Sequence, residues 1–249
     1  MEFKLRTSFL FRLLLKTFKP HAIFDIGSMD ASESLWFHSM LPQTKVVLFE
    51  ANPDNFKKIS QNPLVQKAGI QIENKIVWNQ EGTQTFFVEH PSTEPDKDEH
   101  LPGMSSTRPR MDSGSPYGTS EITAESIRVD TYVNSMTPSP EKIALWIDVE
   151  GAAFEVLEGI AGVSDRVGLI HVEVETVEAW EGQHLKPDIV KLLEDFGFIL
   201  LARGRIEEQH DLVFVNRIHY DKSPGKFKLI VLLAYILTIK LPSLFKMSK

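Results

Sequence analysis

The residues of this chain that are best suited to chemistry follow short apolar segments. The segment 23–28 reads IFDIGS, and its polar members are Asp25, Gly27 and Ser28. An apolar run that ends abruptly in a carboxylate and a glycine is typical of a buried parallel strand, which delivers polar groups to the carboxyl edge of a sheet. Ligands of open α/β sheets bind at that edge. We therefore predict that these three residues belong to a binding site.

An acid ends the next apolar segment. Residues 45–50 read KVVLFE, and Glu50 follows Gly27 by about twenty residues. A strand, a glycine turn, a helix and a second strand that ends in an acid form the layout that holds a nucleoside ribose. Glu50 is predicted to accept hydrogen bonds from two adjacent ribose hydroxyls. The alternative interpretation is an ordinary solvated acid at the end of a strand.

Two carboxylates close a third apolar segment, which reads LWIDVEG over residues 145–151. Asp148 and Glu150 lie two residues apart, so a continued strand would point them to the same side. Gly151 and the helical pattern after it place Glu150 at a turn, where it could also cap the following helix. Asp148 is then the better-placed inward carboxylate. A buried aspartate at a strand tip is costly unless it is hydrogen-bonded or functional.

A fourth segment, residues 169–175, carries His171, Glu173 and Glu175 on one face. Three polar side chains on one face of a strand that should be buried are unusual, so part of this face is expected to open into the site. Histidine has the unperturbed pKa that suits a general base, although a lone histidine is more often a buried core group. Asp148 and Glu173 on neighbouring strand tips could also share Mg²⁺. Nothing in the sequence requires a metal, and none is predicted.

Alternating strands and helices must position these residues. Strands are predicted near 22–27, 45–50, 70–77, 143–149, 167–174, 197–203 and 211–216, and helices near 31–40, 53–60, 151–160 and 185–196. Asn52 is predicted to cap the second helix, with Pro53 in its first turn. The alternation indicates a mainly parallel sheet with helices on both faces. Residues 90–120 hold five prolines and no apolar periodicity, which is typical of a lid, a binding loop or disorder.

Composition limits the classes of protein that fit. The 249 residues, of which 42% are hydrophobic, suit one α/β domain. The absence of cysteine excludes disulfides and cysteine-ligated zinc. The net charge of −7 argues against a nucleic-acid partner.

Basic, apolar segments flank an acidic body. We divide the chain into a basic N-terminal helix (1–20), the main domain (21–221) and a basic C-terminal tail (222–249), which holds six lysines and no acid. Amphipathic helices are predicted at 1–19, with Leu10 and Leu14 on one face, and at 226–246. They would rest on an anionic membrane surface or, equally, pack on the sheet or pair in a homodimer. The apolar run near the C-terminus is too short to span a bilayer, and the N-terminus does not resemble a secretory signal. The expected compartment is the cytoplasm, with peripheral contact at the inner membrane surface.

At this point the motifs resemble a known family. They are FDIGSMDASES (24–34), VVLFEANPDNF (46–56), the pair Ser105-Ser106, IRVDT (127–131), IDVEGAAFEVLEGI (147–160) and the turn EGQ (181–183). Over residues 21–218 the chain resembles S-adenosylmethionine-dependent methyltransferases of the FkbM type. The family usually has a further glycine where this chain has Ala31, which makes a positive φ less expected there.

The resemblance implies a Rossmann-like class I methyltransferase sheet with an antiparallel final strand, and S-adenosylmethionine as cofactor. The acceptor would be a hydroxyl of a sugar, glycolipid or secondary metabolite. The resemblance and the strand-tip pattern together give these site residues: Asp25, Gly27, Ser28, Glu50, Asn52 and Val77 for the cofactor; Ser105, Ser106, Arg108 and Glu150 for the acceptor; and Asp148, Glu173 and His171 for catalysis. Two other classes stay open, a nucleotide-dependent oxidoreductase and a non-catalytic scaffold of the same fold.

Overall fold

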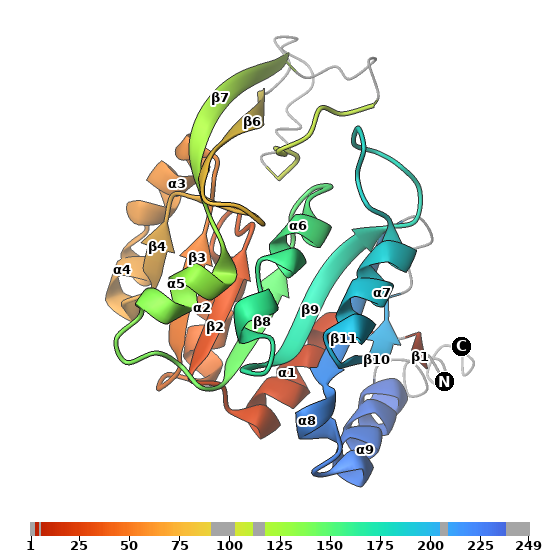
Figure 1. Ribbon diagram of the computed structural model, residues 1–249. Helices are drawn as coiled ribbons and strands as arrows, with labels where there is room; N and C mark the ends of the chain where they lie inside the picture. The colour runs from red at the N-terminus through yellow and green to blue at the C-terminus, as the bar shows by residue number, and fades with distance from the viewer. Residues whose placement is uncertain (1–2, 5, 91–102, 112–117, 205–208, 238–249) are drawn as a thin grey trace, which may run out of the picture.

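The computed structural model describes residues 3–4, 6–90, 103–111, 118–204 and 209–237 (Figure 1). A central sheet of eight strands has the order β1-β10-β11-β9-β8-β2-β3-β4. Its strands are β1 (Phe3–Lys4), β2 (Ala22–Ile26), β3 (Lys45–Phe49), β4 (Gln71–Glu73), β8 (Ile143–Ile147), β9 (Val167–Glu175), β10 (Phe198–Arg203) and β11 (Gln209–Asn216).

The pairing confirms the predicted fold class. β2 pairs in parallel with both β3 and β8, and β8 pairs in parallel with β9. β11 is antiparallel to both β9 and β10. Strands run outward in both directions from the β2–β8 pair, so the topological switch point lies at the carboxyl ends of these two strands. Open α/β sheets bind their ligands at that point.

Helices cover both faces of the sheet (Figure 1). They are α1 (Thr7–Phe18), α2 (Ser32–Met40), α3 (Pro53–Ser60), α4 (Pro63–Ala68), α5 (Val129–Ser135), α6 (Ala153–Glu158), α7 (Lys186–Asp195), α8 (Arg217–Tyr220) and α9 (Pro224–Tyr235), with a 3₁₀ turn at Ala161–Val163. The helices α1, α2, α3, α4 and α9 pack into one core on the first face, and α5, α6 and α7 pack into another on the second. As predicted, Asn52 caps α3, because its side chain accepts a hydrogen bond from the Asp54 backbone N–H.

A second, three-stranded sheet stands beyond the carboxyl edge of the first (Figure 1). It contains β5 (Ile76–Val77), β6 (Gly82–His90) and β7 (Gly118–Ile127), and β6 and β7 form a long antiparallel pair. The single strand predicted over 70–77 is therefore wrong, because it divides between the two sheets. The loop predicted over 90–120 is shorter, because β6 ends at His90 and β7 begins at Gly118. Residues 91–102 and 112–117 of that loop lie outside the described residues.

The N-terminal helix belongs to the folded core. Leu10, Phe11, Leu14 and Leu15 of α1 are fully buried against the sheet. The hypothesis that this helix lays Leu10 and Leu14 on a membrane is therefore wrong, because protein covers its apolar stripe. Among the described residues we find no helix whose length and apolar character would suit it to span a lipid bilayer.

Candidate functional site

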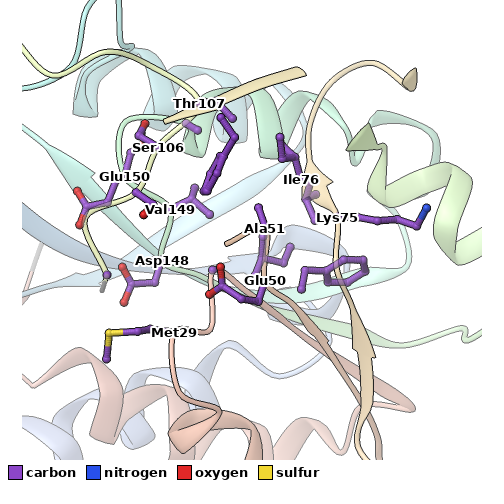
Figure 2. A pocket seen from close by; sticks show the side chains of 18 residues that line it. Met29, Glu50, Ala51, Lys75, Ile76, Ser106, Thr107, Asp148, Val149 and Glu150 are labelled. Carbon is purple, nitrogen blue, oxygen red and sulfur yellow. The ribbon is translucent and has the colours of Figure 1, made fainter. Parts of the chain in front are cut away.

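A cavity lies at the carboxyl ends of β2, β3 and β8, beside the switch point of the sheet (Figure 2). Its atom-free volume, open to solvent at the mouth, is about 570 Å³, within the range of roughly 300–1,000 Å³ for small-molecule sites. Gly27 follows β2, Glu50 follows β3, and Asp148 and Glu150 follow β8; all four line the cavity. The sequence pattern therefore grouped four residues that also lie together in the structure.

Gly27 makes the tightest turn of the site. Its φ is +87°, and its backbone N–H donates to the Phe49 carbonyl at 3.0 Å. A Cβ at this position would lie 1.9 Å from the backbone oxygen of Asp148. Both the conformation and the space therefore require glycine, and the tips of β2 and β8 can approach each other only because this residue has no side chain.

We expect Gly27→Ala to lower the free energy of unfolding by about 2–5 kcal/mol. The left-handed conformation costs alanine about 1–2 kcal/mol, and forcing extra atoms into a packed site adds about 1–3 kcal/mol. Gly69→Ala is the matched control: Gly69 also has a positive φ, of +65°, but no atom lies within 4 Å of an added Cβ. Gly69→Ala should lower the free energy of unfolding only by the conformational cost. Urea denaturation measures the free energy of unfolding of both variants. Equal losses would contradict a tight contact at Gly27.

Asp25 and Ser28 lie behind this turn and do not line the cavity. Asp25 is buried, and its Oδ2 accepts a hydrogen bond from the Ser34 hydroxyl at 2.5 Å. Burial raises the pKa of Asp25 to about 7, and the hydrogen bond from Ser34 offsets part of that rise. These residues therefore brace the turn. Ala31 adopts a left-handed φ of +66° despite its side chain, contrary to the expectation from the sequence.

Glu50 presents a buried carboxylate to the cavity and is only 6% exposed. The backbone N–H of Asn52 donates to its Oε1 at 2.6 Å. Burial raises the pKa of Glu50 to about 7, and that hydrogen bond offsets part of the rise. Asn52 itself does not line the cavity. Its side chain caps α3 and reaches Ser105, so it supports Glu50 from behind.

Apolar side chains form another wall of the cavity. They are Phe49 from β3, Ile76 and Val77 from β5, and Phe86 from β6. A flat heteroaromatic ring would fit against such a wall. Val77 was predicted to contact the cofactor, whereas Phe86 and Met29, which also line the cavity, were not predicted. The only hint of Phe86 in the sequence was the pair Phe86-Phe87, which lies in a segment that was not predicted to be a strand.

Asp148 and Glu173 form a carboxylate pair. Asp148 opens to the cavity, whereas Glu173 is half-buried and does not line it. Burial, followed by repulsion from neighbouring carboxylates, raises the pKa of both groups, and a hydrogen bond between the two side chains opposes the rise at Asp148. Like charges this close do not both ionise readily, so the pair shares a proton near neutral pH. Burial also raises the pKa of Glu150 to about 8.

The structure argues against His171 as a general base. Its ring stacks on Trp146, with centroids 3.7 Å apart, and meets Phe11 edge-on. It is buried and does not line the cavity. Burial lowers its pKa to about 3, so the imidazole stays neutral. We therefore remove His171 from the proposed catalytic residues.

Gly103 and residues 105–107 form one side of the cavity (Figure 2). Ser106 pairs through its backbone with Phe87, and its hydroxyl donates to the Glu150 carbonyl at 2.6 Å. The Ser105 hydroxyl accepts hydrogen bonds from the Asn52 side chain and the Glu89 backbone. Both serines line the cavity, but these contacts show that they also hold the wall in place.

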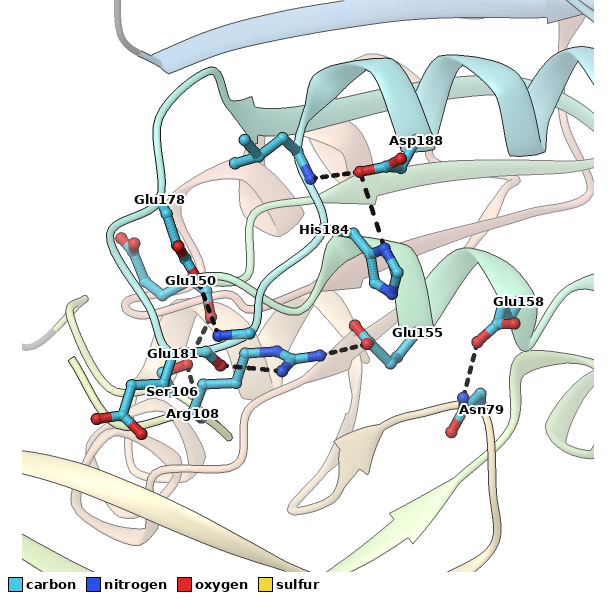
Figure 3. Close-up of polar contacts among 12 residues, drawn as sticks. Asn79, Ser106, Arg108, Glu150, Glu155, Glu158, Glu178, Glu181, His184 and Asp188 are labelled. Carbon is cyan, nitrogen blue, oxygen red and sulfur yellow. Dashed lines mark hydrogen bonds and ion pairs between the residues drawn. The ribbon is translucent and has the colours of Figure 1, made fainter. Parts of the chain in front are cut away.

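Arg108 connects the segment 103–111 to α6 and to the loop after β9 (Figure 3). Its guanidinium forms an ion pair with Glu155 and donates to the Glu181 carbonyl at 3.1 Å. The side chain does not line the cavity. Binding of a phosphate or acidic sugar by Arg108 is therefore not supported, because the guanidinium is paired with Glu155 and does not face the cavity.

No group of three or more histidine, aspartate or glutamate side chains in the described part of the chain could hold a metal ion. We therefore make no proposal for magnesium.

Residues 25–200 match the sequence pattern of the family described as Methyltransferase FkbM domain. The chain belongs to this family. A comparison with curated protein sequences found no match. Membership of the family removes the oxidoreductase alternative, and the protein is an S-adenosylmethionine-dependent methyltransferase.

Three proteins are among the solved structures that this chain resembles in fold. Precorrin-6y C5,15-methyltransferase from Geobacter metallireducens GS-15 is 14% identical, with a TM-score of 0.42 over 85% of this chain and 90% of that one. Ribosomal protein L11 methylase from Lactobacillus delbrueckii subsp. bulgaricus is 11% identical, with a TM-score of 0.42 over 85% and 79%. The N-terminal domain of EvdMO1 with SAH bound is 12% identical, with a TM-score of 0.42 over 86% and 82%. At these scores the likeness carries no argument about function.

The residues of the cavity fit the cofactor of this family. S-adenosylmethionine combines a cationic amino-acid end, a ribose with two hydroxyls and a flat adenine. The glycine turn at Gly27 allows close approach of the backbone, the Glu50 carboxylate can accept from both hydroxyls, and the wall formed with Phe86 is apolar.

Proposed function

We propose that this enzyme is an O-methyltransferase that acts on a hydroxyl of a sugar, a glycolipid or a related polyhydroxylated metabolite. The observation that carries the proposal is the Asp148 carboxylate, which opens to the cavity beside the Gly27 turn. A hydroxyl must lose its proton as it attacks a methyl carbon, and a carboxylate whose pKa is raised by burial accepts that proton more readily than an ordinary one.

The two members of the carboxylate pair have different roles in this proposal. Asp148 accepts the acceptor's proton because it faces the cavity. Glu173 lies behind it and, when protonated, donates a hydrogen bond that orients the Asp148 carboxylate. Glu173 is thus a positioning residue. The bound cofactor supplies an electrophilic methyl group, and the walls of the cavity hold the acceptor oxygen in line with it.

The charge of the cavity favours a neutral acceptor. Among the described residues, three carboxyl groups line it, namely Glu50, Asp148 and Glu150. Lys75 also lines it and is paired with Glu125. An anionic acceptor would meet repulsion here. Glu150, whose pKa is about 8, is largely protonated at neutral pH, so it can both donate to and accept from sugar hydroxyls.

A labelled methyl donor tests the proposal. Purified protein, trideuteriomethyl S-adenosylmethionine and cell-extract metabolites would be incubated together, and products heavier by one labelled methyl group would be identified by fragmentation in mass spectrometry. We expect the label on an oxygen of a polyhydroxylated compound. Label on nitrogen or carbon would contradict O-methylation, and label on a phosphorylated or carboxylated acceptor would contradict the preference for a neutral one.

We expect Glu50→Gln to weaken S-adenosylmethionine binding by about 10- to 100-fold. Hydrogen bonds to a charged group contribute about 1.5–3 kcal/mol, and each 1.4 kcal/mol is a factor of ten. Isothermal titration calorimetry would compare the dissociation constants. Asp54→Asn is the control, because Asp54 is an exposed acid close by on α3 that does not line the cavity. Equal affinities of the wild type and Glu50→Gln would show that the ribose is bound elsewhere.

A further inference from the structure

The helix α9 has two apolar stripes, and among the described residues protein covers one of them and leaves the other exposed. Phe227, Val231 and Ala234 form the inner stripe, which is buried in the core that α9 shares with α1. The outer stripe consists of Leu229, Leu232, Leu233 and Ile236, whose exposed fractions are 55%, 47%, 44% and 38%. Their spacing is that of one continuous helix face. Scattered exposed leucines are ordinary, but a full stripe of them marks an interaction surface.

Lysines surround the start of this exposed stripe. Lys222, Lys226 and Lys228 are all exposed, and the first turn of α9 contains no acid. Cations are disfavoured at the N-terminal end of a helix, where the helix dipole is positive. This placement therefore gains nothing within the helix itself. It favours a negatively charged partner outside it.

We propose that the outer stripe of α9 docks on an anionic lipid surface. The leucines and Ile236 would enter the boundary between headgroups and acyl chains, while the lysines contact lipid phosphates. Residues 222–249 hold six lysines and no acid, although the whole chain has a net charge of −7. The rest of the chain therefore has a net charge of −7 − 6 = −13, so the basic charge of this segment contrasts with an acidic remainder.

Charge also argues against a second copy of the chain as the partner. Pairing two α9 helices would bring together two lysine-rich segments that contain no acid to neutralise them, and such like-charge contacts are unfavourable. An anionic lipid surface instead satisfies both the apolar stripe and the lysines.

Docking through α9 would also determine the orientation of the enzyme on the lipid surface. Figure 1 places α9 at the opposite end of the molecule from the β6–β7 hairpin, and Phe86 of β6 lines the cavity. The cavity would thus lie at the end of the molecule away from the lipid. The inference does not depend on which acceptor the cavity binds.

Vesicle co-sedimentation tests the apolar stripe. We expect the wild type to bind vesicles of phosphatidylglycerol and phosphatidylcholine, and Leu229→Gln/Leu233→Gln to need at least about tenfold more lipid for half-maximal binding. The control is Leu64→Gln, because Leu64 is 61% exposed but lies on α4. It should bind as the wild type does. Thermal unfolding would confirm that each variant is folded.

A second pair of variants tests the lysines. Lys226→Gln/Lys228→Gln should weaken binding by about tenfold or more, and added salt should weaken wild-type binding. Lys57→Gln/Lys58→Gln on α3 removes the same charge from two other exposed lysines and should have little effect. Vesicles of phosphatidylcholine alone should bind the wild type much less.

A fluorescent reporter locates the contact without removing the stripe. The chain has no cysteine, so Leu233→Cys can carry a polarity-sensitive dye as its single label. Its emission should shift to the blue when anionic vesicles are added, whereas the same dye at Leu64→Cys should not respond. Wild-type protein that stays in the supernatant, or equal binding to neutral vesicles, would overturn the proposal. A dimer that Leu229→Gln/Leu233→Gln converts to a monomer, with no lipid binding, would show that a second copy covers the stripe.

Discussion

Asp148→Asn is expected to slow methyl transfer by about 10²- to 10⁴-fold, the usual contribution of general acid–base catalysis. The substitution keeps the shape of the side chain but removes its ability to accept a proton. Because the cofactor contacts proposed for Gly27 and Glu50 remain, the dissociation constant for S-adenosylmethionine should stay within a few-fold of the wild type. Single-turnover rates and calorimetric titration measure the two effects separately. Full turnover by Asp148→Asn would show that another group accepts the proton.

Glu173→Gln distinguishes the positioning residue from the base. Glutamine retains a hydrogen-bond donor toward Asp148 but cannot titrate, so the rate near neutral pH should fall less than in Asp148→Asn. The wild-type pH–rate profile should show the two coupled titrations of the pair, and the variant should lose one of them. Glu178→Gln, at an exposed position in the loop after β9, is the control. An unchanged profile in Glu173→Gln would contradict the coupling.

The positions of the strand tips could be predicted from the sequence because parallel strands are buried on both faces. β2, β3 and β8 are continuous apolar runs, and the polar residues after them mark the carboxyl edge. Since such edges meet at the switch point, Gly27, Glu50 and Asp148 could be grouped from the sequence alone. Spacing along the chain was sufficient for these three residues.

The second sheet could not be predicted in the same way. β7 reads GTSEITAESI, with few apolar residues, and Ser120, Ile122 and Ala124 alternate with exposed polar residues. A strand that is solvated on one side lacks the long apolar run that marks a central strand. β6 and β7 were therefore not predicted, and neither was Phe86 in the cavity wall.

His171 and Arg108 were given roles in the site that the structure does not support. The reason differs between the two residues. His171 and Glu173 share a face of β9, but this face lies on the α1 side of the sheet, where Phe11 and Trp146 enclose the histidine. Only the last residues of β9 reach the carboxyl edge of the sheet. Arg108 lies in the expected region, but its partner Glu155 is 47 residues away in the sequence. A sequence without coordinates does not show such a pairing.

The ligand-free enzyme is expected to lose several kcal/mol of stability as the pH rises from about 5 to about 9. Burial raises the pKa values of Asp25 and Glu50 to about 7, above those of the unfolded chain. The folded state therefore binds these protons more tightly than the unfolded state does. This contribution is complete below the unfolded pKa values, near pH 4, and is lost as the pH passes through 7. Between about pH 5 and about pH 7 each group accounts for roughly 3 kcal/mol, since one pKa unit corresponds to about 1.4 kcal/mol.

Urea denaturation across this pH range, followed by tryptophan fluorescence, measures the effect. Glu50→Gln should make the decline in stability smaller by about 3 kcal/mol, because the variant has no charge to bury at this position. At high pH it should therefore be more stable than the wild type, although it binds the cofactor less tightly. Glu141→Gln replaces an exposed acid and should leave the slope unchanged. A wild-type stability that is constant or increases from about pH 6 to about pH 9 would contradict the burial of these carboxylates. The predicted combination in Glu50→Gln, greater stability with weaker binding, would show that the fold keeps a destabilising acid at the cavity because the cofactor needs it.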